Sequence, residues 1–163
     1  MFRVFTAMVA TLALWTSLSV IGSQPAQAQV GPALTDQTLN TMLTDMGYAP
    51  SALSKGYLIS LKQDTWTVYV QLVLSPDTTK LGFNSNLGAV PNANAVTAAQ
   101  WMGLIAANAD IDPDFFYFDK PKQKLYLHRV LDNRGITPAF LRTQIDLFVG
   151  HLKSTKDLWS FTT

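Results

Sequence analysis

The stretch 110-DIDPDFFYFDKPKQKLYLHRVL-131 decides how the rest of the chain is interpreted. It contains four aspartates, a histidine and two aromatic runs, so it fits either a metal or catalytic site or a β-hairpin with a charged turn. Apolar and polar residues alternate in "KLYLHRVL", and a turn containing Pro121 separates it from "DFFYFD". Alternation bounded by turn residues is typical of paired strands. We therefore interpret the stretch as a hairpin.

The aspartates of this stretch carry little evidence for calcium. Asp110, Asp112 and Asp114 have the spacing that opens an EF-hand loop. Such a loop needs Gly at its sixth position and Glu at its twelfth, which here are Phe115 and Pro121. Aspartate and proline are common where a helix ends and a strand begins. We expect that structural role and no metal site.

No other pattern in the chain indicates catalysis. His128 and His151 are the only histidines, and the sequence has neither cysteine nor glutamate, whereas a metal site needs three or four convergent ligands. There is no Gly-x-Ser-x-Gly motif and no Gly-rich phosphate loop. Because the chain has 11 aspartates, some pair of carboxylates is inevitable, so such a pair is not evidence for glycoside hydrolysis. We expect a non-enzymatic protein without a cofactor, and we interpret His128 as a half-exposed strand residue.

The sequence on both sides of the hairpin predicts the remaining elements. Thr35 is a good N-cap for a helix over 35–47, and Thr137 followed by Pro138 starts a helix that runs to about Trp159. Residues 56–88 predict three strands, and residues 96–110 predict a helix. Four residues lie on one side of this helix: Trp101, Leu104, Ile105 and Asn108.

The predicted order is α-β-β-β-α-β-β-α. Strands joined by short turns pair antiparallel, and amphipathic helices cover one face of such a sheet. The fold class expected is α+β, a two-layer sandwich with an antiparallel five-stranded sheet.

This element order resembles the YbjN and type III secretion chaperone-like superfamily. The resemblance rests on "WMGLIAANADI" entering "FFYFDKPKQKLYLHRVL", followed by the long helix "ITPAFLRTQIDLFVGHLKSTKDLW", and it covers roughly Leu34 to Trp159. It implies a small, non-enzymatic and often dimeric binding protein. Most members of that group are cytoplasmic, and the N-terminus of this chain departs from that pattern.

The N-terminal segment predicts export. Arg3 precedes an apolar run over residues 4–22, and "SQPAQA" then ends in a small-x-small site. This is the pattern of a signal peptide over residues 1–28, with cleavage after Ala28 and a single domain over residues 29–163. An uncleaved anchor is the alternative, because the run could just span a bilayer. Cleavage would place the protein in the periplasm or outside the cell, with no stable membrane insertion.

Charge excludes one class of partner. The chain has 12 basic and 11 acidic residues, and cleavage would remove Arg3, so the mature chain would be neutral. A neutral domain has no long-range field that attracts nucleic acid. We therefore expect no nucleic-acid partner.

The face of the sheet away from the helices is the candidate binding surface. Alternation turns Tyr69, Tyr126 and His128 outward, together with two aromatics of 115–118. An aromatic exposed face often marks an interface, although cross-strand aromatic pairs also stabilise sheets. Trp101 offers a rival surface on its helix. We expect an exported domain that binds an unknown protein partner and forms a homodimer. One alternative is a small-molecule or lipid-binding module with a pocket between helices and sheet. The other is a hydrolase without a recognisable motif, which convergent Asp and His residues in a cleft would favour.

Overall fold

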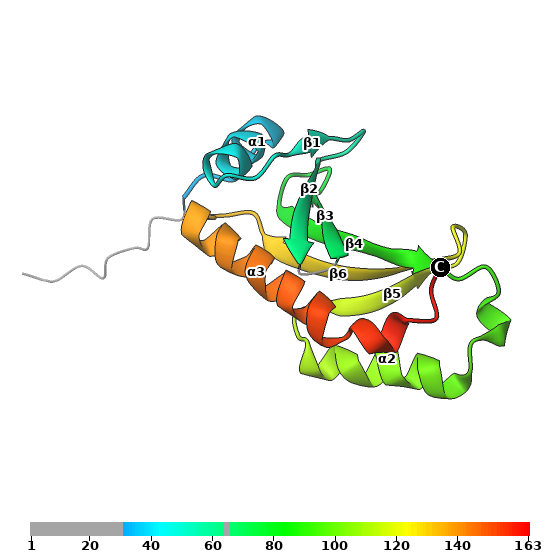
Figure 1. Ribbon diagram of the computed structural model, residues 1–163. Helices are drawn as coiled ribbons and strands as arrows, with labels where there is room; N and C mark the ends of the chain where they lie inside the picture. The colour runs from blue at the N-terminus through cyan, green and yellow to red at the C-terminus, as the bar shows by residue number, and fades with distance from the viewer. Residues whose placement is uncertain (1–30, 64–65) are drawn as a thin grey trace, which may run out of the picture.

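The computed structural model describes residues 31–63 and 66–163. The predicted signal peptide lies outside these residues. The strands form one antiparallel sheet in the order β1-β2-β3-β4-β6-β5. Helix α3 runs along one face of this sheet, and α2 lies beyond β5 (Figure 1). Within the described ranges, no helix has both the length and the apolarity to cross a membrane.

Helix α1 (Asp36–Asp45) begins where the sequence predicts. Thr35 caps it, and the Thr35 and Thr38 side chains satisfy each other's backbone N–H groups in a capping box. Leu39 and Leu43 are fully buried in the core. The entry to the helix is fastened by the buried side chain of Asn133, which accepts a hydrogen bond from Leu34 N–H at 3.1 Å.

The first half of the sheet is a meander. Strands β2 (Tyr57–Gln63), β3 (Trp66–Leu74) and β4 (Lys80–Ala89) pair in sequence order. The sequence predicted these three strands but not β1 (Ser51–Ala52), because two residues show no periodicity. Within the described residues, the sheet therefore has six strands instead of the five expected. After β4 comes a short 3₁₀ helix, η1 (Ala93–Ala95).

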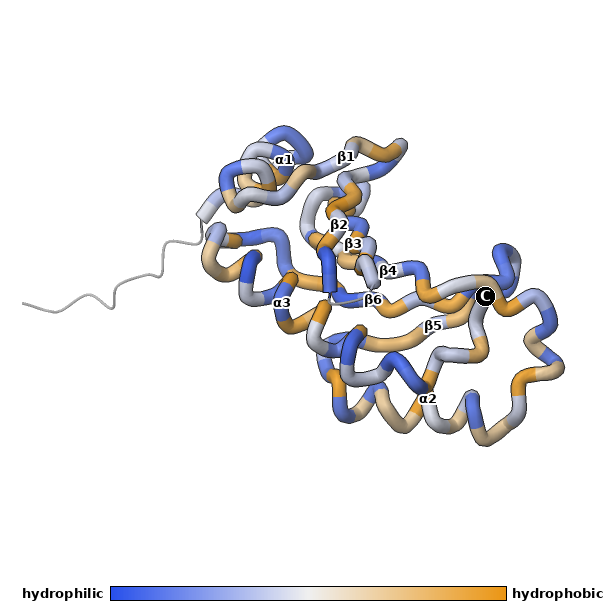
Figure 2. The backbone as a smooth tube through the Cα atoms, in the orientation of Figure 1, coloured by the Kyte–Doolittle hydropathy of each residue, from blue (hydrophilic) through white to orange (hydrophobic). Residues whose placement is uncertain are grey.

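The decisive stretch is a hairpin. Helix α2 (Ala98–Asp110) leads into β5 (Phe115–Asp119), which pairs with β6 (Lys124–Asp132) through the register Tyr117↔Tyr126. The connecting turn is hydrophilic, whereas the paired strands are largely hydrophobic (Figure 2).

Helix α3 (Pro138–Ser154) covers the inner face of the sheet. Thr137 caps it and Pro138 occupies its first turn, as predicted. Its buried residues form the predicted apolar stripe: Leu141, Ile145, Phe148, Val149 and Leu152. The helix stops at Ser154, and the predicted continuation to Trp159 is instead a 3₁₀ helix, η2 (Lys156–Trp159). With that difference and the sixth strand, the α+β class and the element order are confirmed.

Candidate protein-binding surface

Alternation along β3 and β6 separates the two faces of the sheet. On β3, Val68, Val70 and Leu72 are buried, whereas Tyr69 is 55% exposed. On β6, Leu125 and Leu127 are buried while Tyr126 and His128 are only partly covered. We call the face that carries Tyr69, Tyr126 and His128 the open face. The outward direction that the sequence predicted for these three residues is therefore what the structure has.

Four rings gather on the open face where β5 meets β6. Tyr117 stacks on Tyr126 with centroids 5.1 Å apart and planes 11° from parallel. His128 meets Phe115 edge to face at 5.1 Å and Tyr117 at 5.8 Å. We call Phe115, Tyr117, Tyr126 and His128 the aromatic patch. Phe115 and Tyr117 are the two aromatics of 115–118 expected to face outward, and both are exposed.

His128 is the polar centre of this patch. Its Nδ1 lies 2.7 Å from the side-chain oxygen of Asn84 on the neighbouring strand. An amide oxygen can only accept, so Nδ1 carries the proton. Burial lowers the pKa of His128 below its ordinary 6.5. The imidazole is therefore neutral at neutral pH, and the patch presents apolar and hydrogen-bonding surface without a charge at its centre.

Trp101 does not lie on the open face. It is half-buried on α2, with its ring 5.5 Å from that of Phe118 and 5.8 Å from that of Phe161. Met102 points to the other side and is 61% exposed, so the two residues face opposite ways, as expected.

Ile105 shares a predicted helix side with Trp101 and Leu104, but it lies at the surface. It is 61% exposed, because α2 packs along the line of Leu104 and Ala107. The outer side of α2 is thus a second exposed apolar surface.

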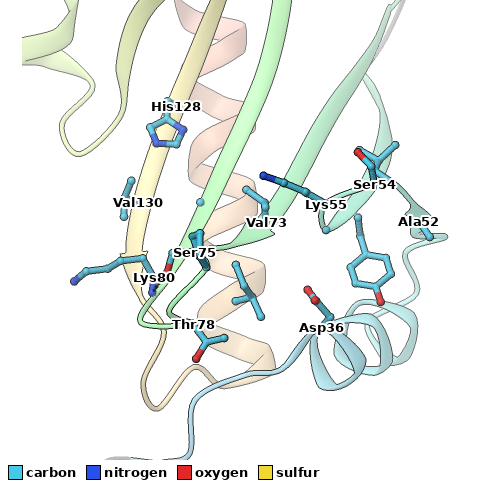
Figure 3. Close-up of a pocket in the computed structure, with 16 residues that line it drawn as sticks. Asp36, Ala52, Ser54, Lys55, Val73, Ser75, Thr78, Lys80, His128 and Val130 are labelled. Atoms are coloured by element: carbon cyan, nitrogen blue, oxygen red, sulfur yellow. Dashed lines mark hydrogen bonds between the residues drawn. The ribbon is translucent and has the colours of Figure 1, made fainter.

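The open face is hollowed beside the patch. A groove of about 740 Å³ lies between the turn that joins β1 to β2 and the strands β3, β4 and β6. Lys55 and Asp36 line one side, and Val73 and His128 line the other (Figure 3). Gly82 also lines the groove. His128 therefore belongs both to the patch and to the groove, which joins them into one surface.

The pocket that would favour a ligand-binding module is small. The cavity between α2 and the sheet, lined by Trp101, Leu104 and Phe118 among others, has a volume of about 200 Å³. Sites for small molecules usually measure roughly 300–1,000 Å³. The space beneath α2 is below that range.

In the part of the chain that the structure describes, Asp114 and His151 converge beside a buried arginine, and their side chains bond to one another. Asp114 and Arg129 are both buried, and the guanidinium binds the carboxylate through Nε and through Nη2, the latter at 2.9 Å. His151 Nδ1 lies 2.7 Å from the same carboxylate, and Arg129 Nη1 donates to Gln144 Oε1 at 2.7 Å. None of these residues lines the groove. Sequence reasoning missed this network because its members are 15 and 37 residues apart.

The aspartates singled out for calcium do not converge. Asp114 is committed to Arg129, while Asp110 and Asp112 are exposed. Within residues 31–63 and 66–163, no three His or Asp side chains come together as a metal-binding group.

Both edges of the sheet are poor templates for a further strand. Edge strand β1 has only two residues. On the opposite edge, the N–H of Phe116 is already donated to Asn108 of α2 at 2.8 Å. Short and capped edges hinder pairing with another chain.

Comparison with solved structures confirms the fold resemblance. A chain of the ExsC–ExsE complex superposes with a TM-score of 0.55 at 17% identity, covering 76% of this chain and 92% of that one. SpcU, in the ExoU–SpcU complex of the Pseudomonas aeruginosa type III secretion system, gives 0.50 at 18% identity, covering 76% and 97%. YbjN from E. coli gives 0.54 at 16% identity, covering 74% and 89%.

These similarities establish a type III secretion chaperone-like α+β fold and nothing finer, because identities this low show shared architecture alone. No protein-family model matches the sequence, and no curated protein matches it either. Function must therefore be argued from the surface.

Proposed function

We propose that this chain is an exported, non-enzymatic protein-binding domain that holds its partner on the open face. The observation that carries the proposal is the aromatic patch beside a groove, on a sheet face that no helix within residues 31–63 and 66–163 covers. Aromatic side chains are enriched in the cores of protein interfaces because they bury large areas at little entropic cost. Sheet faces in contact with water are usually more polar than this one.

The similar structures support this proposal by analogy of fold. Three of them are complexes of two proteins, and one of these is the HopA1–SchA chaperone–effector complex, matched at a TM-score of 0.52 and 9% identity over 73% of this chain. We extend protein binding to this chain as a hypothesis. Export rests on residues 1–28 alone, and we propose that the mature domain begins at Gln29 and acts in the periplasm or outside the cell.

A charge placed in the aromatic patch tests the proposal. The mature chain is immobilised and incubated with an envelope extract of its own source, beside Tyr117→Lys. We expect the substitution to abolish retention of a protein that the wild type retains, because a lysine there must be desolvated on binding. Thr143→Lys is the matched control, since Thr143 is exposed on α3. If both variants retain the same proteins as the wild type, the patch is not the binding site.

We also propose that the chain forms a homodimer. A neutral mature domain lacks the repulsion that keeps copies apart, and pairing of one apolar patch with itself closes a two-fold dimer. The open face with Tyr69 and Tyr126 is one candidate interface. The outer side of α2, with Met102 and Ile105 each 61% exposed, is the other.

Light scattering on substituted proteins distinguishes the two interfaces. We expect the wild type to be dimeric at micromolar concentration. Tyr69→Lys combined with Tyr126→Lys should give a folded monomer if the open face is the interface, and Ile105→Asp should do so if α2 is. A monomeric wild type at high micromolar concentration would end the dimer hypothesis and leave the open face for a different partner.

A further inference from the structure

We propose that the groove beside the aromatic patch binds an acidic side chain flanked by apolar residues, on an extended segment of the protein partner. This inference rests on the proposed protein-binding function and names the chemistry of the partner. The carboxylate of the segment would pair with Lys55, and its apolar side chains would lie on Val73, Gly82 and Val130, which line the groove.

Gly82 gives the groove its depth. A Cβ at this position would lie 3.4 Å from Val73 Cγ1 and 3.5 Å from His128 Cε1, which is ordinary van der Waals contact. The missing side chain thus leaves a hollow between these two residues on the open face. The neighbouring Val73 and Val130 make this part of the groove apolar, so it favours apolar side chains over polar ones.

The turn that carries Lys55 is held firmly against β3. Gln71 Nε2 donates to the Lys55 carbonyl at 2.9 Å. The next residue, Gly56, has φ +71 and lies so close to β3 that a Cβ would be 2.0 Å from the Leu72 carbonyl oxygen. Only glycine fits there. Lys55 therefore projects from a fixed backbone, beside Val73 (Figure 3).

The charges around the groove leave Lys55 without an acidic partner. No carboxylate of the described residues lies within ion-pair distance of its ammonium group. Lys80 also lines the groove but points away from it, and the Asp36 carboxylate lies at the end of the groove next to α1 (Figure 3). The remaining titratable residues of the groove are Tyr57 and His128, and burial lowers the pKa of His128 below its ordinary value, so its imidazole is neutral. An unpaired cation above an apolar surface fits a carboxylate with apolar neighbours.

Continuity with the patch favours a polypeptide over a small molecule. His128 lines the groove and packs on Phe115 and Tyr117, so one extended segment could cover both surfaces. One edge strand has two residues and the other has an N–H already bonded to α2, so a bound segment of the partner would form few backbone hydrogen bonds with the sheet edges. Its side chains would therefore determine the affinity.

Selection from random heptapeptides displayed on phage tests the inference. The wild-type mature domain is expected to enrich peptides in which Asp or Glu is flanked by apolar residues. The enriched peptides, synthesised with a fluorophore, should bind Lys55→Glu roughly tenfold more weakly or worse, because an attraction becomes a repulsion. Lys62→Glu is the matched control: it makes the same charge change on the open face, and Lys62 does not line the groove.

A second variant tests the apolar part without a change of charge. Gly82→Leu should fill the hollow between Val73 and His128. The same peptides should then bind with an affinity lowered by a similar factor. Circular dichroism and the melting temperature of each variant verify that it is folded.

The outcomes separate this inference from the proposed function. If the selected peptides bind Tyr117→Lys more weakly than the wild type but bind Lys55→Glu equally well, the inferred acidic segment is wrong. The proposal that the open face binds a protein would then still hold. Enrichment of peptides without acidic residues would lead to the same conclusion. Failure to enrich any peptide would count against both. Sodium hexanoate that alone binds as tightly as the peptides, with the same dependence on Lys55, would overturn a polypeptide as the occupant.

Discussion

Replacing Phe148 with Asp is expected to lower the free energy of unfolding by roughly 3 kcal/mol or more. Phe148 is fully buried at the centre of the α3 stripe, with its ring 5.8 Å from that of Phe83 on β4. The substitution removes this packing and places a carboxylate in the core. Arg129 lies above the Phe148 ring, but its charge is already compensated by the buried carboxylate of Asp114, so a second buried carboxylate would have no cation of its own.

The neighbouring residue supplies the control. Leu147 is on the same helix and 48% exposed, so Leu147→Asp should change the unfolding free energy by less than about 1 kcal/mol. Urea unfolding followed by circular dichroism measures both values. If Phe148→Asp unfolds at the same urea concentration as the wild type, α3 does not cover the sheet as described.

The α3 stripe shows what could be predicted from sequence. Its period of 3.6 residues and its cap are local signals, and the two-residue alternation of β3 and β6 is equally local. The direction of Tyr69, Tyr126 and His128 followed from that alternation alone. The same reasoning extended α3 to about Trp159, because composition does not distinguish an α-helical turn from the 3₁₀ turn of η2.

Features that depend on contacts between distant segments could not be predicted. The groove exists because the turn before β2 folds back over β3, which only Gly56 allows, and nothing local relates that glycine to Leu72. Periodicity places Ile105 on the same side of the helix as Trp101 and Leu104, yet its exposure depends on which line of α2 meets β5 and η2. These are tertiary choices that the helix pattern alone leaves open.

The network around Asp114 is such a feature, and it leads to the second large effect. Asp114→Asn is expected to destabilise the fold by about 3–5 kcal/mol, because Arg129 would stay buried with its charge uncompensated. The control is Asp112→Asn, an exposed neighbour in the same loop, with an expected change within about 0.5 kcal/mol. Equal unfolding curves for these two variants would contradict the role of the buried pair.

A double variant distinguishes two effects on the free energy of unfolding. One is the cost of leaving Arg129 without its partner, and the other is the net contribution of the intact Asp114–Arg129 pair. In Asp114→Leu with Arg129→Met both charges are removed, and replacing a buried ion pair by apolar residues is often neutral or stabilising. His151 and Gln144 lose a partner but are only half-buried, so water can replace it. We therefore expect the double variant to recover most of the stability lost in Asp114→Asn. An equally large loss would mean that the pair itself stabilises the fold.

The position of the network links stability to the proposed binding surface. Asp114 immediately precedes Phe115, the first residue of β5, and Arg129 immediately follows His128 on β6. The buried pair thus ties together, from the core side, the two strands whose outer sides form the aromatic patch. If the double variant is stable but binds the selected peptides more weakly than the wild type, the pair serves to hold the patch in register. Wild-type affinity in a stable double variant would instead show that strand pairing alone positions Phe115 and His128.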